Sequence, residues 1–173
     1  MPTSRSRLAS LLALLLAVPA GASAQVPLVA SGMAGVSFDL DDRDPVSGGG
    51  FSFLTQVGLA LSRIEFGAEV GQHQLGSDRK ASQYGAFLRF TAPALRRAVP
   101  YLVAGLAQYR YSPAGSGTSH ALGGSLGPGV RLRLDEAHLS LLLEARFHTS
   151  FERMRVISSQ DFIAVSAGLR LAL

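Results

Sequence analysis

The stretch best suited to chemistry is His148-Thr149-Ser150, because a histidine beside a serine can act as general base for a nucleophilic hydroxyl. Successive strand side chains point to opposite faces, so His148 and Ser150 share one face of an extended segment with Glu144. A working pair also needs hydrogen-bond reach and an oxyanion site, which spacing alone does not establish. We therefore interpret these side chains first as polar residues on the inward face of a strand, and we predict no catalytic residue.

A second group of polar residues is formed by charges that recur along the predicted strands. We assign nine of them to the inside of a closed sheet: Glu65, Glu69, Arg89, Arg110, Arg131, Arg133, Glu144, Arg146 and Arg170. An isolated buried ion is very costly, so charges in a narrow lumen must be paired or hydrated. We expect a network of arginine and glutamate side chains that plugs the lumen. The functional alternative is a narrow, mildly anion-selective pore through an arginine-rich constriction.

Metal chemistry has little support. The loop 39–44 offers carboxylate oxygens that could attract a hard cation, but Gly50 stands where an EF-hand loop places its twelfth-position glutamate. The chain has no cysteine, and its four histidines lack a convincing ligand spacing: His73, His120, His138 and His148. We therefore predict no metal and no cofactor.

The elements that must position these residues are eight segments in which apolar and polar side chains alternate. They cover 28–40, 51–62, 63–75, 81–91, 99–111, 119–134, 137–151 and 160–173. Segment 137–151 is long enough to cross a bilayer, which takes about 9–11 tilted residues. In segment 99–111 we place Arg110 on the inward face, opposite Tyr101, Tyr109 and Tyr111. The connections after the first, third, fifth and seventh segments are the longer ones, which is typical of outer-membrane barrels.

The first residues predict export. Arg5 and Arg7 precede an apolar run over 8–18, and Ala22-Ser23-Ala24 follows, which is the pattern of a cleaved secretory signal peptide. We expect a signal over residues 1–24 and one barrel domain over residues 25–173. With a single lysine and no basic stripe in the mature chain, nucleic-acid binding is not expected.

The polar face distinguishes a membrane barrel from a soluble one. A water-facing surface should be about 25–35% charged, whereas these positions are mainly Gly, Ser and Ala with scattered charges. Small residues and a few charges fit a narrow lumen filled by side chains. Aromatic residues near strand ends predict interfacial girdles: Phe51, Tyr84, Tyr101, Tyr109, Tyr111, Phe147 and Phe151. We therefore predict an all-β, eight-stranded antiparallel up-and-down transmembrane barrel.

Four stretches carry a resemblance to a known family: PYLVAGLAQYRY (100–111), GGSLGPGVRLRL (123–134), LSLLLEARFH (139–148) and SAGLRLAL (166–173). The chain resembles the small outer-membrane β-barrel proteins of the OmpA/OmpX-like kind, although these usually end on phenylalanine and this chain ends on Leu173. The resemblance implies a non-enzymatic protein of the bacterial outer membrane with a structural or surface-interaction role.

The same resemblance implies partners and one further alternative. The partners are outer-membrane lipid and lipopolysaccharide, whose phosphates Arg153 and Arg155 could meet, and the outer-membrane assembly machinery; we expect a monomer. Some eight-stranded outer-membrane enzymes that deacylate lipid A carry a His-x-Ser-Asn motif near a strand end. Here Phe151 replaces the asparagine after His148-Thr149-Ser150. A lipid A deacylase therefore stays as the second alternative, after the narrow pore.

Overall fold

The structure is a computed structural model that describes residues 26–40, 49–75, 79–113, 117–134, 138–151 and 161–173. The predicted signal peptide, most of the loop 39–44, and both Arg153 and Arg155 lie outside these residues. Within the described ranges, no helix is long and apolar enough to cross a membrane.

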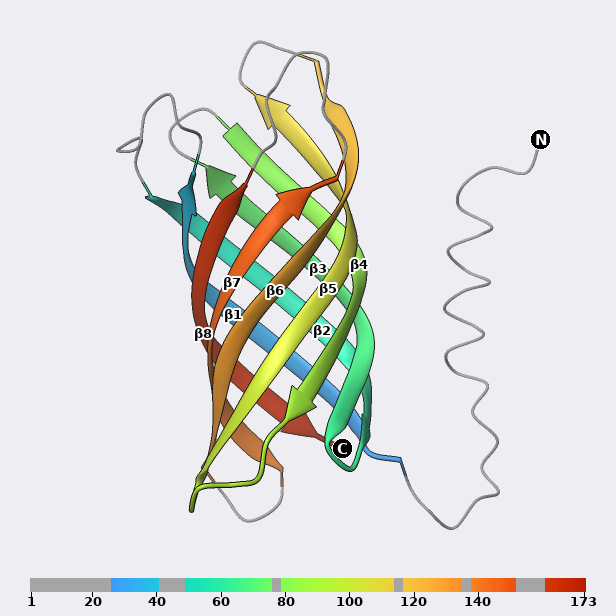
Figure 1. Ribbon diagram of the computed structural model, residues 1–173, viewed down its shortest axis with the longest axis vertical. Coiled ribbons are helices and arrows are strands. Elements are labelled where there is room, and N and C mark those ends of the chain that lie inside the picture. Colours follow the sequence, from blue (N-terminus) through green and yellow to red (C-terminus); the bar gives the residue numbers. More distant parts are fainter. Residues whose placement is uncertain (1–25, 41–48, 76–78, 114–116, 135–137, 152–160) are drawn as a thin grey trace, which may run out of the picture.

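Eight antiparallel strands form one closed barrel in sequence order, which confirms the predicted fold (Figure 1). Their bounds lie close to the predicted segments: β1 Leu28–Asp39, β2 Gly49–Leu61, β3 Ile64–Leu75, β4 Arg79–Thr91, β5 Ala98–Pro113, β6 Ser119–Arg133, β7 Leu139–Ser150 and β8 Phe162–Ala172. The first strand pairs with β2 on one side and with β8 on the other, so every strand has two neighbours. A closed sheet leaves no open edge, which is the condition for a β-structure in lipid.

The two ends of the barrel differ. One end, here the terminus end, holds the start of β1 and the end of β8, where the Leu173 amide donates to the Leu28 carbonyl at 2.8 Å (Figure 1). Two tight turns close hairpins there, at Ser62-Arg63 and Arg96-Arg97, and each begins with a positive φ, 54° at Ser62 and 58° at Arg96. A positive φ at the first turn residue matches the right-handed twist of the flanking strands. The opposite end, the loop end, holds the C-terminal ends of β1, β3, β5 and β7.

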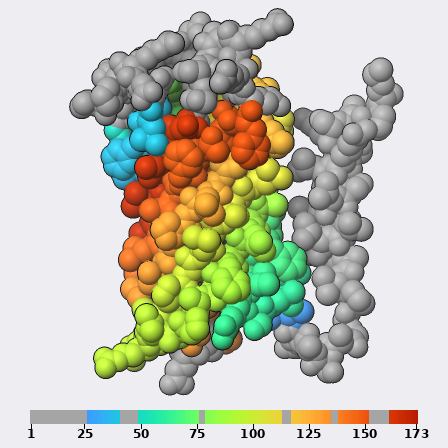
Figure 2. Space-filling view, in the orientation of Figure 1, coloured from blue at the N-terminus to red at the C-terminus, as the bar shows by residue number. Residues whose placement is uncertain are grey.

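The barrel is apolar outside and polar inside. Outward positions carry exposed leucine, valine and phenylalanine, as in Phe66, Leu88, Leu106 and Leu169. Inward positions carry buried polar side chains, and the burial of β7 alternates accordingly along its length. Side chains cover the wall between the strands on the face seen in Figure 2. This is the reverse of a water-soluble barrel, which turns its apolar face inward.

The orientation of β5 differs from the prediction. Tyr101, Tyr109 and Tyr111 are buried inside the barrel, whereas Gln108 and Arg110 are exposed on its outer face. The three tyrosines therefore fill the lumen and do not form interfacial girdles, and the placement of Arg110 in the lumen is wrong. The tyrosines point inward because glycines on the neighbouring strand β6 leave room for their rings inside the barrel.

Candidate functional site: a charge network across the lumen

Glu65 is the centre of the charge network near the terminus end. Its carboxylate accepts from Arg89 Nη1 at 2.7 Å, Arg131 Nη1 at 2.7 Å and Arg170 Nη2 at 2.8 Å. These arginines come from β4, β6 and β8, while Glu65 lies on β3 and is 3% exposed. One carboxylate therefore ties together strands from around the barrel. Removing one partner from a buried pair of this kind is strongly destabilising, because it leaves an uncompensated buried charge.

A second layer lies in the middle of the barrel around Arg146. Its Nη1 atom donates to Glu69 Oε2 at 2.8 Å, and its Nε atom contacts Glu144. The Tyr101 hydroxyl donates to Glu144 Oε2 at 2.9 Å. Arg146 on β7, Glu69 on β3 and Tyr101 on β5 thus meet near the barrel axis. Glu144 and these three side chains are at most 4% exposed, so this layer is a buried polar network inside the barrel.

Arg89 joins the two layers. One of its terminal nitrogens reaches Glu65, while Nη2 donates to Gln56 Oε1 at 2.8 Å and lies 3.5 Å from Glu144 Oε2. Its guanidinium also lies 4.7 Å from the centroid of the Tyr101 ring, a cation–π arrangement. Arg89 therefore contacts both layers, and its loss would affect each.

Two glutamines extend the network between the ions. Gln56 Nε2 donates to Glu69 Oε2 at 3.0 Å, and Gln83 Nε2 donates to Glu69 Oε1 at 3.1 Å. Sequence reasoning missed both glutamines because it selected charged residues alone. Both glutamines occupy inward positions in the alternating patterns of β2 and β4, and this pattern could have identified them.

Above these layers, toward the loop end, lies a cluster of aromatic rings. His73 contacts Ser52 Oγ through Nδ1 at 2.8 Å and Gln83 Oε1 through Nε2 at 3.1 Å. The ring of His148 stacks on Phe162 with centroids 4.3 Å apart and lies 5.0 Å from His73. These buried rings occupy the lumen above the ions. No group of three or more His, Asp or Glu among the described residues could hold a metal ion.

The His148–Ser150 pair lies within this closed interior. Both side chains point inward, 1% and 8% exposed respectively. His148 Nδ1 lies 2.9 Å from the Tyr109 hydroxyl, so tyrosine is the hydrogen-bond partner of that ring nitrogen. The Ser150 hydroxyl has no hydrogen-bond partner among the described residues, hence no base in contact. Among the described residues, His148 and Ser150 are therefore not hydrogen-bonded to each other.

Of the nine charged residues predicted to share the lumen, seven contact one another inside the barrel. Arg110 lies on the outer face of β5. Arg133 has the inward parity of Arg131 but lies at the end of β6, where its side chain is exposed and makes no ion pair with a described residue. A charged residue at an inward position therefore does not always join the lumen network, because the end of a strand is open to water.

Glycines on β6 make room for tyrosines on β5. Tyr101 is paired with Gly129 across the two strands, and a Cβ atom on Gly129 would lie 2.2 Å from the Tyr101 ring. A Cβ on Gly123 would similarly lie 2.9 Å from the ring of Tyr109. The tyrosine rings lie over glycine backbone that carries no side chain. This placement of the Tyr101 ring directs its hydroxyl toward Glu144.

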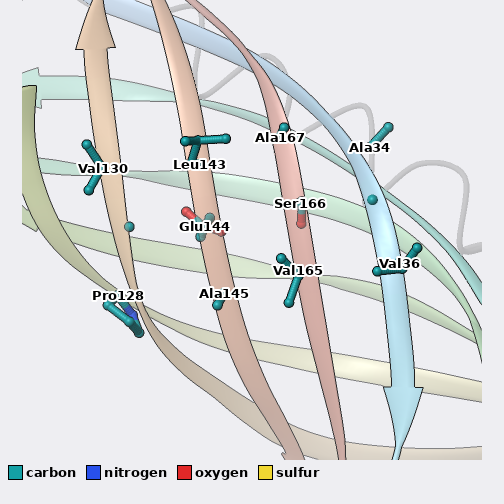
Figure 3. A pocket seen from close by; sticks show the side chains of 12 residues that line it. Ala34, Val36, Pro128, Val130, Leu143, Glu144, Ala145, Val165, Ser166 and Ala167 are labelled. Atoms are coloured by element: carbon teal, nitrogen blue, oxygen red, sulfur yellow. The ribbon is translucent and has the colours of Figure 1, made fainter. Parts of the chain in front are cut away.

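The outer wall also carries a shallow apolar groove of about 610 Å³ over β6, β7, β8 and β1 (Figure 3). Small outward residues form it, among them Ala34, Ala145 and Ala167, together with Pro128. The β6–β7 pairing is interrupted between Leu126 and Gly129, as expected because proline removes a ladder donor. Glu144 of the charge network and Ser166 are also among the residues that line the groove.

No family model matches the sequence, and no curated protein matches it either. Solved structures do match. Neisserial surface protein A is similar with a TM-score of 0.72 at 18% identity, over 83% of this chain and 96% of that protein. The N-terminal β-barrel domain of Pseudomonas aeruginosa OprF is similar with a TM-score of 0.57 at 15% identity, over 84% of this chain and 97% of that one.

At these identities the similarity establishes the architecture, and it covers nearly the whole of each neighbour. Both neighbours are small eight-stranded outer-membrane barrels. Closure in sequence order, an apolar exterior and a polar interior are present in this chain as well. The chain therefore has the fold of the small eight-stranded outer-membrane β-barrels.

Proposed function

We propose that this protein is an integral protein of the bacterial outer membrane with a structural or surface-interaction role, and that its arginine–glutamate network plugs the lumen. The observation that carries the proposal is the Glu69–Arg146–Glu144 layer, in which buried ions from facing strands meet at the axis. A lumen filled at this height supports a stable scaffold that displays the connections at its loop end.

The outer surface supports the membrane location. Large apolar side chains are exposed on all eight strands, and Leu106 and Leu169 are 55% and 53% exposed. Continuous apolar surface of this extent would aggregate in water and marks a membrane or protein interface. Closure of the sheet also satisfies backbone groups that lipid cannot. We place the loop end outside the cell and both termini on the periplasmic side.

The partners and the absence of enzymatic activity belong to the same proposal. We propose contact with outer-membrane lipid and lipopolysaccharide, folding through the outer-membrane assembly machinery, and a monomeric state. We also propose that the protein has no enzymatic activity, a view supported by the Tyr109 partner of His148 and by the buried position of Ser150.

A narrow pore is the second candidate, and one observation favours it. The network contains four arginines on three glutamates, an excess of one positive charge: Arg89, Arg131, Arg146 and Arg170 with Glu65, Glu69 and Glu144. An excess of fixed positive charge would favour anions in any water-filled path. The plug is favoured over the pore because eight strands leave little space beyond their own side chains.

The membrane proposal is tested by extraction and gel mobility. We expect the mature protein to need detergent for solubility, to give a far-UV β-sheet signal in detergent, and to migrate differently on gels before and after boiling. A protein that stays soluble and monomeric without detergent or lipid would refute the membrane location.

A further inference from the structure

The outer face of the barrel is not uniformly apolar at its loop end. On β3 to β6 the last outward positions carry polar or basic side chains, all at least partly exposed: Gln72, Gln74, Lys80, Gln108, Arg110 and His120. On β8, β1 and β2 the corresponding outward positions are apolar (Ile163, Phe38, Phe51 and Phe53), and on β7 Phe147 is followed by the uncharged Thr149. We call the six polar and basic residues the basic face. It lies where the apolar outer wall ends on one side of the barrel.

The strand register brings the basic side chains together. Arg110 on β5 is paired directly with His120 on β6. Lys80 on β4 is paired with Ser112, two residues from Arg110 on the same face of β5. Directly paired residues have Cβ atoms about 4.5–5.5 Å apart and diagonal ones about 7–8 Å. Three side chains from three adjacent strands can therefore reach one small anion.

No carboxylate neutralises this face within the described part of the chain. Four of the described acidic residues are buried in the barrel interior, and the fifth, Asp161, is half-buried just before β8. Lys80 and Arg110 thus have no acidic neighbour on the outer wall among the residues that the structure describes. Like charges placed together on one face of a sheet are destabilising, so the arrangement favours an anionic partner.

A small pocket adjoins the basic face. It has a volume of about 130 Å³ and is lined by two phenylalanines of β2 and three members of the basic face: Phe51, Phe53, Gln72, Gln74 and Lys80. Phe53 is paired with Gln72 across β2 and β3, so apolar and polar side chains meet on one surface. Such a boundary matches a lipid at the junction between its acyl chains and its headgroup.

We propose that the basic face binds the phosphorylated sugar headgroup of a membrane glycolipid. Arg110 and Lys80 donate charge-assisted hydrogen bonds to a phosphate group, with His120 beside them, and acyl chains lie against Phe51 and Phe53. The glutamines distinguish a sugar phosphate from a simple phosphate ester, because their amides donate to and accept from hydroxyl groups. The inference rests on the proposed membrane location, and it assigns a partner to residues that the lumen network does not use.

The test uses the full mature protein in detergent micelles, with bound lipid counted by native mass spectrometry during titration with lipid A. We expect Lys80→Gln/Arg110→Gln to weaken lipid A binding at least tenfold. The matched control Arg63→Gln/Arg97→Gln removes two exposed arginines from the tight turns at the terminus end, and we expect it to bind as the wild type does. Equal affinity of the wild type and the Lys80/Arg110 variant would overturn the proposal.

Two further titrations identify the headgroup. Dephosphorylated lipid A should bind to the wild type at least tenfold more weakly than lipid A does. It should bind with equal affinity to the wild type and to the Lys80→Gln/Arg110→Gln variant. Phosphatidylglycerol, which carries a phosphate without the sugar, should also bind more weakly than lipid A. Equal binding of either lipid and of lipid A would refute the glycolipid assignment. Heat-modifiable migration on gels serves as the folding control for every variant. Failure of the proposed membrane location would be seen separately, as a wild-type protein that stays soluble without detergent.

Discussion

The Nη1 atom of Arg146 on β7 lies 2.8 Å from Oε2 of Glu69 on β3, and these strands stand opposite each other in the ring of eight. A single ion pair therefore spans the interior of the barrel. The same layer holds Glu144 and the Tyr101 hydroxyl. Opposite walls are thus connected through side chains as well as through the hydrogen-bonded circumference, and the space between them is occupied.

Removing one member of this pair should destabilise the barrel strongly. Arg146→Ala leaves Glu69 and Glu144 buried without their shared cation, and breaking a buried pair in this way costs roughly 3–5 kcal/mol. The chain has no tryptophan, so unfolding in urea with phospholipid vesicles is best followed by far-UV circular dichroism and by gel mobility. We expect a large fall in the free energy of unfolding.

The matched control for Arg146→Ala is Arg133→Ala, because Arg133 is an exposed arginine at a strand end. Its removal should change the free energy of unfolding by less than about 0.5 kcal/mol. The double variant Glu69→Ala/Arg146→Ala should lose less stability than the sum of the two single variants, since each residue's partner is then absent. Additive losses, or equal losses for Arg133 and Arg146, would contradict the assigned pair.

Gly129→Ala should also be destabilising, because the new methyl group would lie 2.2 Å from the Tyr101 ring. Overpacking of this kind costs about 1–3 kcal/mol. Combining Gly129→Ala with Tyr101→Ala removes the clash, so the added cost of the alanine at 129 should largely vanish in the double variant. An unchanged cost in that background would show that the ring does not occupy the space over Gly129. The same urea titration measures all three variants.

The β5 strand shows how far the sequence predicts the fold. Alternation in 99–111 separates two faces correctly, but both faces carry apolar and polar residues, so the pattern does not say which face is inside. Tyrosine is amphipathic and suits either a membrane interface or a polar lumen. The signal that could have decided was the glycine-rich inward face of β6, which leaves space for tyrosine rings opposite it.

The strands and most of the lumen charges were predictable because period-2 patterning fixes which residues share a face. The ion-pair partner of each charged residue could not be predicted. The pairing of Glu65 with Arg89, Arg131 and Arg170 depends on the stagger between strands. Stagger is set by the closed ladder as a whole and is not visible in any one segment. The neutral members Gln56 and Gln83 were not predicted, because the lumen network was predicted from charged residues alone.

Lipid A deacylation should be absent. Purified protein in micelles with lipid A should release no fatty acid above the buffer background, and Ser150→Ala should give the same result as the wild type. The expected reason is that, within the described ranges, the Ser150 hydroxyl contacts no base and the partner of His148 Nδ1 is the Tyr109 hydroxyl. Release by the wild type that is abolished in Ser150→Ala would instead establish the hydrolase alternative.

Emptying the middle layer should open a path for ions. Glu69→Ala/Arg146→Ala removes one negative and one positive side chain, so the net charge of the lumen is unchanged while its filling is reduced. We expect brief conductance events in planar bilayers from this double variant. The control Arg63→Ala alters an exposed turn residue and should give no such events. A silent double variant would show that other side chains close the barrel.

The conductance of the purified wild-type protein in a planar bilayer shows whether the arginine–glutamate network plugs the native lumen. The plug predicts a flat current trace at voltages of either sign, from protein shown by heat-modifiable migration to be folded. Stable single-channel steps that change in size or ion selectivity when Arg131 or Arg146 is replaced would contradict it and establish the narrow pore.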